Sequence, residues 1–184
     1  QCLLTKGRSV GADFFIQTIM TRIGILSDTH GYWDERYAHY LGECEAIFHC
    51  GDIGSLLLAE RLQDIAPLRA VYGNIDDSET RHRFPETLSV TIERVRIALI
   101  HIGGYPGRYT AAAKELIART QPHLFLSGHS HILKVMPDRK NNLLHINPGA
   151  AGIQGWQPVR TLVRLVVDGE QLRDLEVIEL SGYR

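Results

Sequence analysis

The chain of 184 residues is 44% hydrophobic and 22% charged, which suits a globular domain with a full-sized core. Its net charge of −1 argues against a broad basic surface for nucleic acid or anionic membranes. Three cysteines without a CxxC spacing indicate reduced thiols, and no apolar run reaches the roughly 18 residues of a membrane span. We therefore expect a cytoplasmic protein without stable nucleic-acid or membrane binding.

Residues 1–19 lack the pattern of the rest of the chain, whose natural start is MTRIGILSD at Met20. They contain neither the compact apolar stretch nor the A-x-A-like site of a secretory signal. We expect this leader to be disordered or not native. Residues 20–184 are expected to form a single domain that carries the function.

Strands and helices alternate in the first half. Apolar runs that end in polar residues predict strands at 22–28, 45–52 and 68–74. Helices are predicted at 34–44, where Asp34 could cap the first turn, and at 55–66, between Ser55 and Pro67. This alternation predicts βαβ units and a largely parallel sheet.

Period-two patterns dominate the second half. They predict hairpins at 87–101, 132–147 and 160–180, with turns at Glu93-Arg94, near Asn141-Asn142 and at Asp168-Gly169. A helix at 109–120 and a strand within 123–131 lie between the first two hairpins. Both halves are accommodated by an α/β fold with two packed sheets flanked by helices.

Polar metal-binding side chains follow five of the predicted strands. They lie in SDTHG, CGDIG, YGNID, IHIGG and SGHSH, and they are Asp28, His30, Asp52, Asn74, His101, His129 and His131. Ligands of open α/β sheets bind at the carboxyl ends of the strands. In an extended segment residues i and i+2 point to the same side, so Asp28/His30 and His129/His131 could each address one point.

Carboxylate, amide and imidazole donors together favour borderline divalent ions such as Mn²⁺, Zn²⁺, Fe²⁺, Co²⁺ or Ni²⁺. Seven donors exceed the needs of one ion, whereas two ions about 3.5–4 Å apart, bridged by one carboxylate, would use them. Each motif alone has an ordinary explanation, such as a turn, a helix cap or a core histidine. Five such accidents at the strand ends of one fold are much less plausible than one site.

In this order, D-x-H, GD, GN, H and G-H-x-H resemble the motifs of the calcineurin-like metallophosphoesterase superfamily. The small size, GNID at 73–76 and INPGA at 146–150 resemble its compact bacterial and archaeal phosphodiesterase branch. The resemblance extends from about Met20 to Leu180. It implies a four-layer αββα sandwich in which two mixed sheets are flanked by helices.

The resemblance also implies a division of the ligands between two divalent metal ions. Asp28, His30, Asp52 and His131 would hold one ion; Asp52, Asn74, His101 and His129 would hold the other. Mn²⁺ is the first expectation, with Zn²⁺, Ni²⁺, Fe²⁺ or Co²⁺ as alternatives. A metal-bridged water, as hydroxide, would attack the phosphorus of a phosphodiester, or of a phosphomonoester.

One position departs from this pattern. Many members read Gly-Asn-His after the third strand, and that histidine is thought to protonate the leaving group. Ile75 stands there in this chain and cannot donate a proton. Because loss of a general acid costs about 10²–10⁴-fold on poor leaving groups, alkyl monoesters become less plausible substrates.

Two further residues have open roles. Asp76 could orient a ligand histidine from behind the metal centre or simply end a turn. Arg108, in the glycine-rich stretch 103–109, could contact a substrate phosphate, although a solvent-exposed arginine is the more common case. The expected partner is a small phosphoester substrate, with a homo-oligomer left open. The alternative functions are a non-catalytic binding scaffold resembling the retromer complex's small subunit, and a nucleotide or protein phosphatase.

Overall fold

Residues 20–180 are described by a computed structural model, and the expected leader, 1–19, lies outside the described residues. The strands in this part are β1 (Met20–Leu26), β2 (Ala46–His49), β3 (Leu68–Ala70), β4 (Thr87–Ile92), β5 (Val95–Ile100), β6 (Leu124–Leu126), β7 (Leu133–Asp138), β8 (Leu143–Pro148), β9 (Thr161–Asp168) and β10 (Gln171–Glu179). The helices are α1 (Arg36–Leu41), α2 (Leu56–Ile65), α3 (Ser78–Arg83) and α4 (Ala111–Thr120).

The strands form two mixed sheets, as expected. The first has the order β10-β9-β1-β2-β3, in which β1, β2 and β3 are parallel and β9 and β10 are antiparallel additions. The second has the order β4-β5-β6-β8-β7, with a parallel centre and antiparallel strands at both edges. All three predicted hairpins are present, as β4–β5, β7–β8 and β9–β10.

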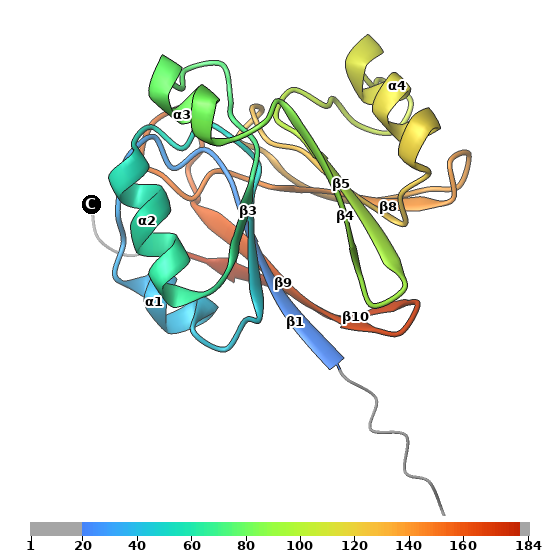
Figure 1. Cartoon of the computed structure of the whole chain (residues 1–184), viewed down its shortest axis with the longest axis horizontal. Coiled ribbons are helices and arrows are strands. Elements are labelled where there is room, and N and C mark those ends of the chain that lie inside the picture. The colour runs from blue at the N-terminus through green and yellow to red at the C-terminus, as the bar shows by residue number, and fades with distance from the viewer. Residues whose placement is uncertain (1–19, 181–184) are drawn as a thin grey trace, which may run out of the picture.

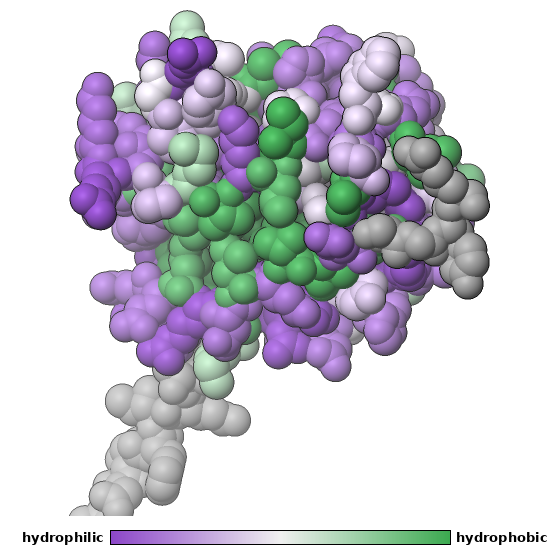
Figure 2. All heavy atoms as spheres, turned by 180° about the vertical axis from the view of Figure 1, so that it is seen from behind, coloured by the Kyte–Doolittle hydropathy of each residue, from purple (hydrophilic) through white to green (hydrophobic). Residues whose placement is uncertain are grey.

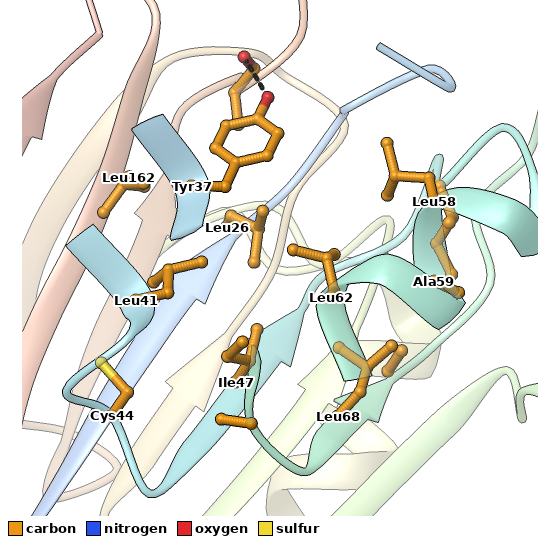
Figure 3. Close-up of a cluster of buried hydrophobic side chains, with 14 of the residues drawn as sticks. Leu26, Tyr37, Leu41, Cys44, Ile47, Leu58, Ala59, Leu62, Leu68 and Leu162 are labelled. Atoms are coloured by element: carbon orange, nitrogen blue, oxygen red, sulfur yellow. Dashed lines mark hydrogen bonds between the residues drawn. The ribbon is translucent and has the colours of Figure 1, made fainter. Parts of the chain in front are cut away.

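Three apolar clusters hold the layers together. The central one joins the inner faces of the two sheets, with Ile23 and Phe48 on one side and Ile97 and Leu124 on the other. A second cluster packs α1 and α2 on the outer face of the first sheet, where the Tyr37 hydroxyl donates to the Ala151 carbonyl (Figure 3). The third cluster covers the second sheet with α4. The result is the expected four-layer αββα sandwich, visible in Figure 1.

Side-chain caps explain where three helices begin. Ser55 Oγ accepts from Leu58 N, and Thr110 Oγ1 accepts from Ala113 N, at helices that the sequence predicts. The short helix α3 was not predicted, because its six residues bury only Thr80 and show no apolar stripe. Its start is nevertheless marked by Asp77, whose Oδ1 accepts from Thr80 N.

Asp34 caps the first turn of α1 from the position before Glu35, the residue at the helix boundary, because Asp34 Oδ1 accepts from Arg36 N at 3.0 Å. The same carboxylate also binds two guanidinium groups. Arg36 donates to both of its oxygens, and Arg160 donates to Oδ2 at 2.8 Å. Arg160 also donates to the Ala151 carbonyl, so this partly buried ion pair ties the loop after β1 to the entry of β9.

The edges of the two sheets leave apolar surface exposed on one face of the molecule. Leu133 and Val135 on β7, and Leu175 and Val177 on β10, are each more than a third exposed. Viewed from behind, apolar side chains gather in the middle of the molecule between hydrophilic borders (Figure 2). In the described part of the chain, no helix has the length and apolar character needed to cross a membrane.

Replacing the Asp34 carboxylate should make the free energy of unfolding depend less on pH in the acidic range. Hydrogen bonds from Arg36, and to a smaller extent Arg160, hold the pKa of Asp34 well below its usual range although burial opposes this. The stabilisation is therefore complete above the unfolded pKa of about 3.9 and is lost as the pH falls toward the folded value. Asp34→Asn should lower the free energy of unfolding by about 2 kcal/mol at neutral pH.

Urea unfolding measured at pH 7 and at acidic pH checks this expectation. The difference between wild type and Asp34→Asn should shrink between about pH 5 and pH 3. Glu35→Gln removes a neighbouring carboxylate that is exposed and paired with Arg61, so it should change stability by less than about 1 kcal/mol. A difference for Asp34→Asn that is the same at both pH values would contradict the assignment.

Candidate metal centre

The structure brings most of the predicted ligands to one place between the ends of the two sheets. Asp28 and His30 follow β1, Asp52 follows β2 and Asn74 lies just beyond β3. From the second sheet, His101 follows β5, while His129 and His131 follow β6. The parallel arrangement of β1, β2 and β3, and of β5 and β6, directs these strand ends to a common edge.

One group of donors consists of Asp28, His30 and His131. One ligand atom from each lies within 4.8 Å of the others. The Nε2 atoms of His30 and His131 are 3.3 Å apart, and His131 Nε2 is 3.3 Å from Asp28 Oδ1. Asp28 is fully buried, and His30 and His131 are partly buried, so the group is shielded from solvent on most sides.

A second group consists of Asp28, Asp52 and His101, again within 4.8 Å of one another. Asn74 Oδ1 lies 3.1 Å from His101 Nε2 and extends this group. The His129 ring is exposed and contacts the His101 ring edge-on, with centroids 5.2 Å apart. Five of the seven predicted ligands therefore form two adjoining clusters, and Asn74 and His129 lie beside the second.

Asp28 is common to both clusters, and Asp52, a member of the second, also faces the first. Its Oδ1 is 3.3 Å from His101 Nε2, and its Oδ2 is 4.0 Å from His30 Nε2. The two oxygens of one carboxylate thus face histidines of different clusters. This arrangement suits a bridging carboxylate.

The hydrogen bonds behind the imidazoles show that the Nε2 atoms of His101 and His131 face the centre of each cluster. His101 Nδ1 is 2.8 Å from the Cys50 carbonyl, which can only accept, so Nδ1 carries the hydrogen. His101 Nε2 is then an acceptor in the neutral ring, yet it faces Asp52 Oδ1 and Asn74 Oδ1. Acceptors at such distances repel one another unless a cation lies between them.

The same pattern is found at His131. Its Nδ1 is 2.9 Å from Gln157 Oε1, and Gln157 Nε2 donates to the Gln154 carbonyl, which identifies Oε1 as an acceptor. His131 Nε2 is therefore directed toward Asp28 as a lone pair in the neutral ring. Asp28 Oδ1 is buried and has no hydrogen-bond partner in the described residues. A cation is the partner that these atoms lack, so the residues fit a metal site.

Protons on the histidines supply only part of the positive charge that a metal ion would bring to the carboxylates. The contact with Asp28 raises the pKa of His131 to about 9. Burial lowers the pKa of His101, but Asp52 and the charge of Asp28 outweigh it and raise the pKa overall. The pKa of Asp52 is lowered despite burial, chiefly by His101. A metal ion bound here would displace protons from these histidines.

The backbone produces this convergence in a different way from the one expected. Five of the predicted ligands have positive φ: Asp28 (54°), His30 (49°), Asp52 (54°), His129 (68°) and His131 (56°). The expectation of extended segments with side chains on one side was therefore wrong. Residues with a Cβ rarely adopt this left-handed conformation, and each costs roughly 1–3 kcal/mol unless its surroundings enforce it. Such strain concentrates at functional sites.

Glycine is required where the ligand loops approach one another most closely. A Cβ on Gly73 would lie 2.0 Å from Asp52 Oδ1. A Cβ on Gly128 would lie 2.1 Å from Ser27 Oγ and 2.9 Å from Asp28 Oδ2. The glycines beside the predicted ligands therefore provide space for the carboxylates.

Asp76 supports the site through the backbone. Its carboxylate is buried and accepts from the N–H groups of Ile53, Gly54 and Gly73. These bonds join the loop that carries Asp52 to the loop that carries Asn74. Among the described hydrogen bonds of Asp76, none reaches a histidine, so its position differs from the expected one behind a ligand ring.

His49 connects the loops of the first sheet, a role that the sequence did not reveal. It is fully buried and also makes specific hydrogen bonds. Nδ1 accepts from Gly51 N, and Nε2 lies 2.9 Å from Thr29 Oγ1, which donates to the Ile53 carbonyl. Burial lowers the pKa of His49 to about 4, so the ring is neutral and can serve as both donor and acceptor.

Arg108 and Ile75, singled out in the sequence, lie outside the clusters, whereas Gln157 contacts a predicted ligand. Arg108 is exposed, and none of the side-chain interactions described for residues 20–180 connects it to the clusters. Ile75 is about half exposed next to Asn74, and its N–H donates to Asp52 Oδ1. Gln157, which fixes the His131 ring, is distant in sequence from every predicted ligand motif, so no local pattern could have identified it.

Comparison with known proteins agrees with this geometry. Residues 21–170 match the model of the calcineurin-like phosphoesterase superfamily domain, and the chain belongs to this family. It is 30% identical over 170 residues to a probable metallophosphoesterase of Methanothermobacter thermautotrophicus, covering 87% of this chain and 93% of that one. A probable metallophosphoesterase of Methanocaldococcus jannaschii is 27% identical over 177 residues, covering 90% and 86%.

Solved structures share the fold at lower sequence identity. A predicted phosphoesterase of Streptococcus pneumoniae has a TM-score of 0.66 at 22% identity, covering 87% of this chain and 90% of that one. Vps29 of Entamoeba histolytica, complexed with Zn²⁺, has a TM-score of 0.67 at 16% identity, covering 87% and 99%. The chain thus belongs to a family of metal-dependent phosphoesterases, and its groups of metal-ligating side chains lie where the fold brings strand ends together.

Removing the hydrogen bonds of His49 should weaken metal binding without unfolding the protein. His49→Phe keeps an aromatic ring of similar size but releases Thr29 and Gly51, which flank the ligands. We expect metal affinity to fall by about 10–100-fold, as is typical when groups that orient metal ligands are lost. Calorimetric titration of the metal-free protein with Mn²⁺ measures this affinity in wild type and variant. His39→Phe, at an exposed histidine, is the control, and an unchanged affinity in His49→Phe would exclude the positioning role.

Proposed function

We propose that the protein hydrolyses phosphodiesters with a dinuclear metal centre. Asp28, His30, Asp52 and His131 would hold one divalent ion. Asp52, Asn74, His101 and His129 would hold the other, with Mn²⁺ as the preferred metal. The observation that supports this division most strongly is the position of Asp52, whose two oxygens face histidines of different clusters.

The chain's own residues orient and neutralise the site. When bound, two divalent ions supply a water of lowered pKa and positive charge for the phosphoryl oxygens. Cys50 and Gln157 hold the His101 and His131 rings by their Nδ1 atoms, so that Nε2 faces inward. Asp76 and His49 hold the loops in the strained conformation that directs the ligands to one centre.

An ester with a good leaving group is favoured over an alkyl ester, because the site shows no proton donor at the position after Asn74. The residue there is Ile75, which is exposed and apolar. A leaving group that needs little protonation, such as a phenolate, reacts without a general acid. The substrate is therefore expected to carry a good leaving group, and the positive charge that attracts it comes from the ions rather than from a chain of net charge −1.

Metal-dependent hydrolysis tests the proposal directly. The stripped protein should be inactive on bis(4-nitrophenyl) phosphate and should regain activity when Mn²⁺ is added. Asp52→Asn should lose metal binding and activity together, because the bridging charge is removed. Asp64→Asn, at an exposed aspartate on α2, is the control and should behave as wild type.

Two results would count against the proposal. No hydrolysis with Mn²⁺, Zn²⁺, Ni²⁺, Fe²⁺ or Co²⁺ would favour a binding scaffold of the same fold. Full activity in Asp52→Asn would refute the two-ion assignment. A panel of diesters, monoesters and cyclic nucleotides, assayed with the preferred metal, would then separate a diesterase from a nucleotide phosphatase.

Installing a proton donor should broaden the range of leaving groups. Ile75→His should raise the rate on an alkyl ester, whose leaving group needs protonation, by at least about tenfold relative to the rate on a nitrophenyl ester. Ile75→Gln is the control, since it is polar but cannot act as an acid near neutral pH. The measurement is the ratio of kcat/KM for the two esters, and a ratio that does not change in Ile75→His would contradict the expected role of this position.

A further inference from the structure

A cavity opens beside the half of the metal centre that contains His129 and His131. Its volume is about 860 Å³, and both histidines form part of its wall. Beyond them the lining is mostly apolar and comes from the segment after His131 and from the loop before β9. Its main apolar members are Ile132, Leu133, Trp156, Pro158 and Val159.

The apolar side chains of this cavity are unusually open to solvent. Trp156 is fully exposed, and Ile132 is 57% exposed. An apolar group bound in this cavity would remove these side chains from water, and leaving them exposed costs free energy. Gln157 is adjacent to Trp156 and fixes the His131 ring, so the loop that presents the indole is also the loop that positions a candidate ligand.

The charges around the cavity restrict what it can hold. None of the described residues that line it is a lysine or an arginine. A second anionic group on the substrate would therefore find no cationic side chain among these residues to pair with. The negative charge of the phosphoryl group is instead taken up at the metal centre.

A smaller cavity lies on the other half of the centre. It has a volume of about 380 Å³ and is lined by Asn74 and His101 together with Tyr72 and Arg81. The Arg81 guanidinium already donates to the Asp76 and Asn74 carbonyls, at 2.7 and 2.8 Å. The centre is thus flanked by two spaces, as the two ester arms of a phosphodiester require.

We propose that the cavity at Trp156 binds an uncharged aromatic ester group of the substrate, with the indole as the stacking surface. This rests on the function proposed above and narrows its substrate class to diesters with at least one neutral aromatic arm. Aromatic contacts of this kind add to the gain from burying apolar area.

Binding of two small phosphonates tests the cavity without relying on turnover. Phenylphosphonate and methylphosphonate present the same head group to the metals and differ only in the arm. Calorimetric titration of the Mn²⁺-loaded wild type should show phenylphosphonate binding about tenfold more tightly. Trp156→Ala should remove most of this preference and leave the affinity for methylphosphonate unchanged, whereas Trp156→Phe should retain most of it.

Leu57→Ala is the matched control, because Leu57 is an apolar residue, 67% exposed, on α2, and lines none of the cavities described for residues 20–180. It should leave both affinities unchanged. Equal affinity of wild type for the two phosphonates, or a Trp156→Ala variant that loses both alike, would overturn the cavity assignment.

The same samples separate this inference from the proposed function. Hydrolysis of bis(4-nitrophenyl) phosphate without a Trp156-dependent preference would refute the aromatic site and leave the diesterase intact. A Trp156-dependent preference in a protein that hydrolyses no ester would refute the proposed hydrolysis and support the aromatic binding site alone. Loss of both would overturn both.

Discussion

Hydrogen bonds between the loops after β1 and β2 are the constraint on which the site depends. Asp28 N and His30 N donate to the carbonyls of Gly51 and Asp52, and Gly31 N donates to that of Ile53. The parallel pairing of the two strands therefore continues into the loops, beyond the ends of the strands. This pairing keeps Asp28, His30 and Asp52 in left-handed conformations that a free loop would leave.

The second sheet joins this arrangement through equally specific contacts. The Gly128 N–H donates to the His101 carbonyl, and the His129 N–H donates to Asp28 Oδ2, which links the ends of β5 and β6 to the loop after β1. Because the inner faces of both sheets share one apolar cluster, their separation is set by core packing. Gly128 then allows the backbone of one sheet to approach the carboxylate of the other.

Much of the fold and of the candidate site could be predicted because both depend on local patterns. Period-two alternation identified the three hairpins, and the polar residues after apolar runs indicated the seven candidate donors. The helix α3 could not be found in this way, since its six residues have almost no buried face. The left-handed backbone at Asp28 and His131 could not be found either, because it results from contacts with distant loops rather than from the residues themselves.

The supporting residues were missed for the same reason. Gln157 meets His131, and His49 meets Thr29, only after the chain has folded, and neither pair has a characteristic spacing. The cavity beside Trp156 likewise combines segments that are separate in sequence. Local patterns therefore located the donors, whereas their orientation and the shape of the adjoining space depend on long-range packing.

The Asp28 carboxylate divides its two oxygens between different tasks. Oδ2 accepts from His129 N, while Oδ1 faces His131 Nε2 and has no hydrogen-bond partner among residues 20–180. An asparagine at this position could keep the bond to the backbone with its oxygen and would turn an NH₂ group toward the cluster. The proposed metal binding and the loop architecture thus depend on different atoms of one side chain. Such a substitution would remove a candidate metal ligand and still keep the surface that the loops form.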